Sequence, residues 1–213
     1  MGKVRVAGFG VSLDGFGAGP DQGLEHPLGK RGGELHNWFY PTRSFRSMIG
    51  KAGGTKGADD RFARASMAGF GAFILGRNMF GPAGDDWGGP DWKGWWGDNP
   101  PYHAPTFILT HQARAPIVME GGTTFHFVAD GIESALIQAR TAAGDLDVKI
   151  GGGVSTVRQY LLAGVIDEMH LAVSPVVLGR GESLFAGVDL PCLGYRVAET
   201  VPTELATHVL LTR

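Results

Sequence analysis

Short apolar runs alternate with amphipathic segments along most of the chain. Apolar runs of about four to eight residues, bounded by glycine, proline or polar turns, are typical of buried strands, whereas apolar residues three and four positions apart are typical of helices. The pattern predicts strands at 3–13, 72–77, 106–110, 115–120, 124–130, 147–150, 166–179, 195–201 and 206–212, and helices at 58–71, 131–144 and 154–164.

The segments between these elements are predicted to be loops. Two of them, 14–33 and the stretch that ends near Gly57, are rich in glycine, and a third, 82–105, contains four tryptophans. Residues 34–40 fit either a short helix or a short strand.

Strands and helices alternate until about residue 165, and strands then follow strands. This order predicts an α/β fold with a mixed, mostly parallel central sheet and an antiparallel edge at the C-terminal end. Neither an internal repeat nor a linker interrupts the pattern, and 213 residues suffice for a sizeable core. We therefore expect a single domain that spans residues 1–213.

Composition excludes several classes of partner. A formal charge of −2 with interspersed signs gives no global attraction to nucleic acid or to an anionic membrane. No apolar run approaches the roughly 20 residues of a membrane helix, and the first residues lack the apolar core of a signal peptide. Cys192 is the only cysteine, so an internal disulfide is impossible. These features favour a cytoplasmic protein that acts on a small molecule.

Three consecutive glycines, Gly151, Gly152 and Gly153, join a predicted strand to a predicted helix. Free amides at a helix N-terminus and the helix dipole favour an anion there, and glycines let a phosphate approach the backbone. The alternative is a tight turn that lets strand and helix pack closely. The spacing matches neither G-x-G-x-x-G nor a P-loop, so the triplet alone does not name the ligand.

Two other predicted strands end in polar residues. The strand at 72–77 runs into Gly76 and Arg77, whose planar guanidinium suits a phosphate, although an ordinary surface ion pair is the alternative. The strand at 106–110 ends in Thr110 and His111. Because ligands of open α/β sheets bind at the carboxyl ends of the strands, we expect these ends to share one crevice.

Taken in order, these motifs resemble the dihydrofolate-reductase-like superfamily, and within it the branch that contains the reductase domain of riboflavin biosynthesis. The stretches that carry the resemblance are "AGFGVSLDGF" at 7–16, "FILGRNMF" at 73–80, "FILT" at 107–110, "TFHFVADGIESALIQARTAAG" at 124–144 and "IGGGVSTVRQYLLAGVIDEMHLAVSPVVLGRGESLF" at 150–185. The resemblance implies the three-layer dihydrofolate-reductase-like fold, NADPH as cofactor and a homodimer.

The resemblance also implies roles for individual residues. Ala7 and the stretch from Ser12 to Gly15 would face the nicotinamide. Arg77 would lie near the ribose 2′-phosphate, beside Gly76 and Asn78. Thr110 and His111 would lie at the adenosine end, and the pyrophosphate would be held by Gly151, Gly152, Gly153, Val154 and Ser155.

The chain departs from the family pattern at the substrate end. Dihydrofolate reductases carry a carboxylate on their first long helix, whereas here Asp60 falls at the start of that helix, where capping is the alternative. Asp14 is a second candidate acid, and its alternative role is to fix a turn. The acidic residue that precedes the glycine turn in riboflavin-type reductases is replaced by Ile150, with Lys149 before it. We expect Asp14, Asp60 or an ordered water molecule to supply a proton.

The predicted substrate is a small heteroaromatic compound of pterin or pyrimidine type, or another compound with a C=N or C=C bond. The tryptophan-rich loop either packs against the protein, covers the substrate or forms an interface, and Trp38 and Trp87 are the candidate substrate contacts. The seven histidines lack metal-ligand spacing, so no metal site is expected.

Two other functions compete with the reductase. Ser155, Asp167 and His208 follow the chain order of a serine hydrolase, but Val157 occupies the second glycine position of a nucleophile elbow. The other alternative is a non-catalytic protein that keeps the nucleotide crevice.

Overall fold

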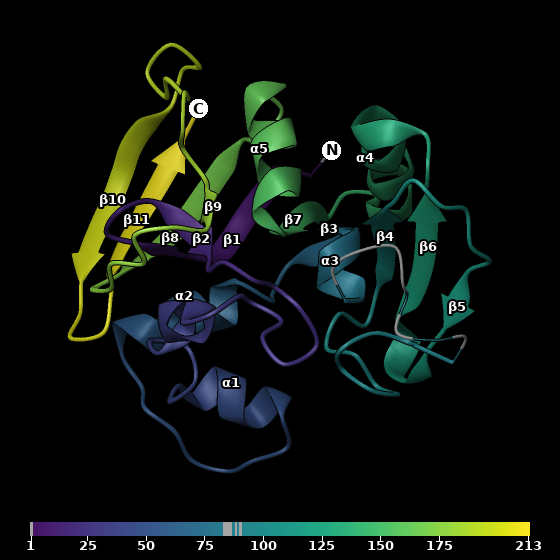
Figure 1. Cartoon of the computed structure of the whole chain (residues 1–213), viewed down its shortest axis with the longest axis horizontal. Coiled ribbons are helices and arrows are strands. Elements are labelled where there is room, and N and C mark those ends of the chain that lie inside the picture. Colours follow the sequence, from purple (N-terminus) through teal and green to yellow (C-terminus); the bar gives the residue numbers. More distant parts are fainter. Residues whose placement is uncertain (1, 83–86, 88, 90) are drawn as a thin grey trace.

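The computed structural model describes residues 2–82, 87, 89 and 91–213. Its elements (Figure 1) are β1 (Val4–Ser12), β2 (Phe16–Ala18), η1 (Gly32–His36), α1 (Arg43–Met48), α2 (Ala58–Ala65), β3 (Phe70–Gly76), α3 (Arg77–Phe80), β4 (Pro105–Leu109), β5 (Ile117–Val118), η2 (Glu120–Gly122), β6 (Thr124–Val128), α4 (Gly131–Ala143), β7 (Asp147–Gly152), α5 (Val154–Leu162), β8 (Glu168–Ser174), β9 (Glu182–Ser183), β10 (Arg196–Pro202) and β11 (Thr207–Thr212).

A nine-stranded sheet in the order β10-β11-β8-β1-β7-β3-β4-β6-β5 forms the centre of the protein. The six strands from β8 to β6 are mutually parallel, whereas β11 and β10 close one edge with antiparallel pairs. The predicted mixed, mostly parallel sheet with an antiparallel C-terminal edge is therefore confirmed. The short strand β5 adds an antiparallel pair at the opposite edge, which the sequence pattern did not predict as antiparallel.

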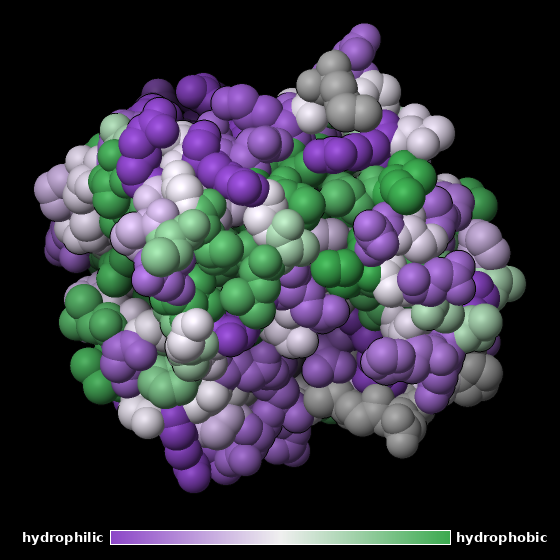
Figure 2. All heavy atoms as spheres, turned by 90° about the horizontal axis from the view of Figure 1, so that it is seen from above, coloured by the Kyte–Doolittle hydropathy of each residue, from purple (hydrophilic) through white to green (hydrophobic). Residues whose placement is uncertain are grey.

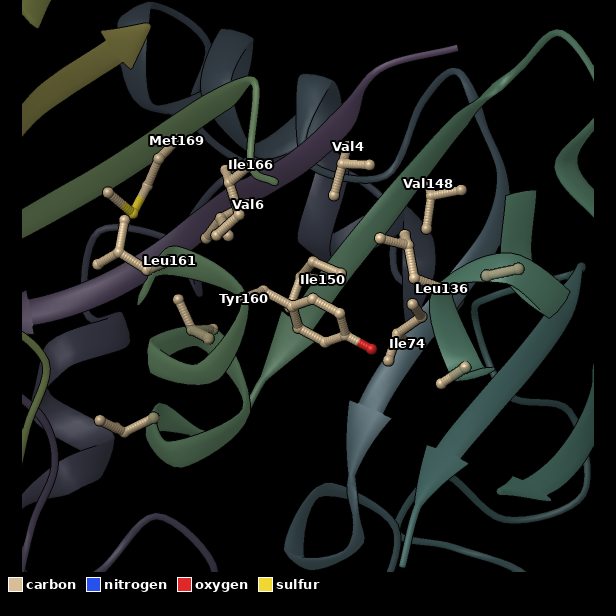
Figure 3. Packing of buried hydrophobic residues seen from close by; sticks show 14 of the residues in the cluster. Val4, Val6, Ile74, Leu136, Val148, Ile150, Tyr160, Leu161, Ile166 and Met169 are labelled. Carbon is tan, nitrogen blue, oxygen red and sulfur yellow. The ribbon is translucent and has the colours of Figure 1, made fainter. Parts of the chain in front are cut away.

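Helices cover both faces of this sheet, which gives the expected three layers (Figure 1). Helices α4 and α5 pack on one face, where valine and isoleucine side chains of β1, β3 and β7 meet Tyr160 and Leu161 of α5 (Figure 3). The Tyr160 hydroxyl donates to the Ile132 carbonyl at 2.8 Å, so this large buried ring also joins α5 to α4. The two helices are thereby fixed to each other on this face of the sheet.

Segments η1, α1 and α2 lie on the other side of the sheet in Figure 1. Phe62 of α2 stacks on the rings of His170 and His208 with centroids 4.3 Å away in each case. Trp38 packs edge-on against the same two rings. This second core is smaller than the first and includes two histidine rings. Phe39, which packs against it, also lines a cavity next to β7.

Sequence patterning missed two features. Helix α1 lies inside a segment expected to be a glycine-rich connection, and β2 pairs with β9 in a separate two-stranded sheet. Seen from above, the molecular surface shows apolar atoms gathered around the middle of the face, bordered by hydrophilic ones (Figure 2). Within the described residues, no helix combines the length and the apolar character needed to cross a bilayer.

Candidate functional site

A cleft of about 480 Å³ opens at the carboxyl ends of the parallel strands. Residues of β1, β3 and β7 line it, together with the segments that follow β4 and β6 and the first turn of α5. This edge is where ligands of open α/β sheets bind, and the volume lies within the range of small-molecule sites, roughly 300–1,000 Å³.

The glycine triplet forms the turn between β7 and α5. Gly151 is tightly packed, because a Cβ added there would lie 2.5 Å from Leu75 Cδ2. Gly152 has a φ of +125°, a region that favours glycine. A Cβ on Gly153 would instead meet nothing within 4 Å. The triplet therefore fits both interpretations of the sequence. Gly151 and Gly152 fit a tight turn, and Gly153 leaves open space in the cleft, as the approach of a phosphate requires.

Helix α5 begins immediately after that open space. Gly153 is its N-cap residue, and no side chain caps the first turn. Backbone amides of a first helical turn have no partner within the helix, and Val154, Ser155 and Thr156 all line the cleft. Uncapped amides at the N-terminus of a nine-residue helix attract an anion.

Arg77 lines the cleft at the end of β3. Its guanidinium lies over the Trp87 ring, 4.9 Å from the centroid, and donates to the Pro82 carbonyl. The Trp87 indole in turn donates to Gln112 Oε1 at 2.7 Å. The arginine is thus held on the cleft side of the molecule by the tryptophan-rich segment.

Most of the residues expected at the cofactor line this one cleft: Gly76, Arg77, Asn78, Thr110, His111, Gly151, Gly152, Gly153, Val154 and Ser155. Ala7, Ser12 and Gly15 do not belong to the lining, whereas Gly8, Phe9 and Gly10 do. Near Gly8 the pairing of β1 with β8 shifts its register, and Gly8 has a φ of +73°. Such a bulge changes which residues face the cleft, and strand alternation does not reveal it.

The two candidate acids lie outside the cleft lining. Asp14 accepts from the amides of Leu178 and Gly179, and its hydrogen bond with Ser12 contributes most to lowering its pKa to about 2. Asp60 accepts from the Ser44 amide at 2.7 Å, which joins α2 to the first turn of α1. Both carboxylates therefore have structural partners, but not the expected ones: Asp14 binds a distant segment, and Asp60 binds the first turn of α1 rather than that of α2, whose N-cap is Gly57.

The two candidate tryptophans also line neither cavity. Trp38 is fully buried against the histidine pair, which leaves it no surface to offer a substrate. Trp87 contacts Arg77 rather than the cleft itself. Of the roles left open by the sequence, packing describes both: Trp38 is buried in the core, and the half-buried Trp87 packs against Arg77.

A second, smaller chamber of about 130 Å³ adjoins the cleft. Gly8, His36, Met79 and Gly151 line both cavities, so the two are contiguous. The chamber lies over β7 and is otherwise enclosed mainly by aromatic and methionine side chains, together with the polar residues Ser66, Tyr102 and Lys149.

Sequence reasoning assigned no role to His36 or Lys149. Burial lowers the pKa of His36, and its Nδ1 atom is buried without a hydrogen-bond partner among the described residues. Burial, and secondly the charge of Arg5, lower the pKa of Lys149 to about 8. The signal available in the sequence was a lysine in the middle of a buried strand.

The hydrolase arrangement does not form. His208 contacts His170 through Nδ1 and Asp59 through Nε2, at 3.0 Å and 2.8 Å. Asp167 accepts from the Val4 amide. Neither residue is therefore available to activate Ser155. Among the described residues, no group of three or more histidine, cysteine, aspartate or glutamate side chains could hold a metal ion.

Comparisons with known proteins agree with this architecture. The model of the family described as "RibD C-terminal domain" matches residues 5–207. A structure from Shewanella sp. PV-4, provisionally named a riboflavin biosynthesis protein, has a TM-score of 0.59 and 22% identity, and the match covers 100% of this chain and 99% of that one. A search of curated proteins found no match.

Two further structures share the fold. The diaminohydroxyphosphoribosylaminopyrimidine deaminase/5-amino-6-(5-phosphoribosylamino)uracil reductase of Thermotoga maritima has a TM-score of 0.54 and 12% identity, over 99% of this chain and 56% of that one. Dihydrofolate reductase of Enterococcus faecalis, complexed with NADP(H) and RAB-propyl, has a TM-score of 0.53 and 15% identity, over 99% and 96%. At these identities the likeness establishes the dihydrofolate-reductase-like fold, which confirms the expectation from sequence.

Proposed function

Because the chain belongs to the RibD C-terminal domain family, we propose that it is a reductase that uses NADPH to reduce a C=C or C=N bond in a small planar substrate. The fold is of the reductase type, as in the Thermotoga reductase and the Enterococcus dihydrofolate reductase. The NADP(H) bound to the latter supports NADPH as the cofactor here.

The residues of the cleft fit such a dinucleotide. The open space beside Gly153 and the uncapped first turn of α5 suit a pyrophosphate. Arg77 would bind the 2′-phosphate, Thr110 and His111 the adenosine, and Gly8 would lie beside the nicotinamide, where the cleft meets the chamber. The open space above Gly153 is the observation that carries the proposal.

The bound cofactor would supply a hydride, and the chain itself would orient the substrate and exclude water. The chamber, enclosed largely by apolar side chains, would hold the substrate next to Gly8. His36 lines both cavities and is the titratable side chain best placed to hydrogen-bond a substrate at their junction. A proton supplied by Asp14 or Asp60 stays a prediction, as does a homodimer, which sedimentation of the chain would check.

The test is a valine at Gly153. Its backbone has a φ of −69° and free space for a Cβ, so the fold should accept the side chain, whereas at Gly152 the φ of +125° would add strain. We expect Gly153→Val to weaken NADPH binding at least about 100-fold by calorimetry, because the valine occupies the phosphate site and displaces charged hydrogen bonds.

Gly33→Val is the matched control, since Gly33 also has nothing within 4 Å of its Cβ position and lies outside the cleft lining. It should leave NADPH affinity unchanged. Full affinity in a folded Gly153→Val protein would remove the cofactor from this cleft. Tight NADPH binding by the wild type without turnover of any pterin, pyrimidine, enone or imine would favour the non-catalytic alternative.

A further inference from the structure

Lys149 is the one cationic side chain among the described residues that line the chamber. It lies on β7 two positions before Gly151, and both residues line the chamber. Its Nζ donates to the Ser66 carbonyl at 2.6 Å and lies 3.7 Å from Met67 Sδ. An ammonium has three N–H groups, so Lys149 can still donate a hydrogen bond to a further neighbour or to a ligand.

The acidic residues nearby form ion pairs with a different cation. Arg5 forms ion pairs with Asp147 at 3.1 Å and with Glu168 at 2.9 Å. Among the described residues, no carboxylate pairs with Lys149, and none lines the chamber. An ammonium removed from water without a counter-ion is costly, so an anion that entered the chamber would gain from the pairing.

The shape of the chamber limits the size of that anion. Its volume of about 130 Å³ is close to that of a cavity of about 150 Å³ that holds one benzene ring. Phe73, Met67 and Trp96 contribute apolar walls that suit a flat ring. Tyr102 and His36 add polar atoms to the lining.

We propose that the chamber binds a planar, single-ring anion, such as an aromatic carboxylate, and that Lys149 is the residue that selects for its negative charge. That this ligand is the substrate of the enzyme rests on the proposed reductase function. A pterin or an aminopyrimidine presents N–H donors that a carboxylate accepts most strongly, and the described lining of the chamber lacks one. The chamber therefore disfavours the pterin-like substrates expected from the family resemblance.

A purely structural role for Lys149 makes a different prediction. Ser66 is the C-cap of α2, and a lysine that donates to the last carbonyls of a helix stabilises its C-terminus. In that case, replacing Lys149 would lower stability but would not change which small molecules bind.

Three probes of matched shape separate the two roles: benzoate, benzamide and benzamidinium carry charges of −1, 0 and +1 on one planar ring. Their binding to the cofactor-free wild type and to Lys149→Met can be followed by the fluorescence and indole NMR signal of Trp96, which lines the chamber. We expect the wild type to prefer benzoate over benzamide by about tenfold or more, with benzamidinium weakest. Lys149→Met should lose this preference, and Lys149→Arg should keep it.

Three results would overturn the proposal: equal benzoate-to-benzamide ratios in the wild type and Lys149→Met, stronger binding of benzamidinium, or no binding of benzoate to the wild type. Benzoate held at the N-terminus of α5 would be insensitive to Lys149→Met and lost in Gly153→Val, and would also count against the chamber. If Lys149→Met does not fold, the preference of Lys149→Gln decides instead. NADPH titration is separate, so the chamber and the reductase assignment can fail independently.

Discussion

At the scale of single residues, Arg77 shows how a surface aromatic can position a charged group. The guanidinium lies over the Trp87 ring, and one of its nitrogens donates a hydrogen bond to the Pro82 carbonyl. An arginine whose side chain is already held loses less conformational entropy when it binds a phosphate. The tryptophan-rich segment therefore contributes to the cleft through Arg77, although Trp87 itself does not line it.

Replacing Arg77 by alanine should weaken NADPH binding by about 10–100-fold, because a charged hydrogen bond contributes about 1.5–3 kcal/mol. NADH, which lacks the 2′-phosphate, should lose much less. Fluorescence titration of both nucleotides measures the difference. Arg114→Met is the control, since Arg114 also lies over Trp87, at 5.3 Å, but does not line the cleft. An equal loss for both nucleotides would remove Arg77 from the 2′-phosphate.

The residues that sequence reasoning could identify at the cleft were those with a local signal. Glycines at a strand end and Arg77 directly after a strand both follow from chain order alone. His36 had no such signal, and Lys149 offered only its place within a buried strand, because the position of both in the chamber depends on how η1 and α2 fold over β7. Trp38 was misjudged for the same reason: its sequence context does not reveal that His170 and His208 will bury it.

At the scale of elements, long periodic segments were predictable and short elements held by tertiary contacts were not. Strands β1 and β8 fall within predicted segments, and β4 and β7 differ from theirs by one or two residues at one end, because their apolar runs are continuous. Strand β3 begins at Phe70, in a stretch that was predicted to be the end of a helix. Helix α1 has only six residues and no buried side chain. Its first turn depends on Thr42 Oγ1, which accepts from the Phe45 amide, and on Asp60 of α2.

Removing the Asp60 carboxylate should therefore destabilise the packing of α1 on α2. We expect Asp60→Ala to lower the free energy of unfolding by about 0.5–2 kcal/mol, as for the loss of a helix cap, and to leave NADPH affinity unchanged. Denaturant unfolding measures the first quantity, and calorimetry the second.

Asp60→Asn discriminates between the structural role and the predicted catalytic one. The amide oxygen of asparagine can still accept from Ser44, so the variant should keep most of the stability. If Asp60 instead donates a proton to the substrate, the asparagine variant would fold normally and lose turnover. That outcome would show that the Asp60 carboxylate is a catalytic group, although it lies outside the cleft lining.

At the scale of the whole molecule, one buried hydrogen-bonded chain connects four elements. The Gly8 amide of β1 donates to His170 Nδ1 of β8 at 3.1 Å, and His170 Nε2 contacts His208 Nδ1 of β11. His208 Nε2 contacts Asp59 of α2. Because the Gly8 amide can only donate, His170 carries its hydrogen on Nε2, and both rings are neutral with fixed tautomers. A second proton on His170 would place two donors face to face.

This chain makes stability dependent on pH. Burial, then the neighbouring His208, then the cations Lys149, Arg61 and Arg5 lower the pKa of His170 to about 3 from an ordinary value of 6.5. Burial also lowers the pKa of His208, against the opposing effects of Asp59 and Glu199. Between pH 6.5 and 3 the unfolded chain therefore binds more protons than the folded one, so the free energy of unfolding falls as the pH falls.

From pH 7 to pH 5 the contribution of His170 should fall by about 2 kcal/mol, since one pKa unit corresponds to about 1.4 kcal/mol. His170→Gln removes the titrating ring, so its free energy of unfolding should start lower at pH 7 but decline by about 2 kcal/mol less than that of the wild type. Guanidinium unfolding at the two pH values measures both declines. Parallel declines would mean that His170 is protonated in the folded state, and the tautomers assigned from the Gly8 amide would then be wrong.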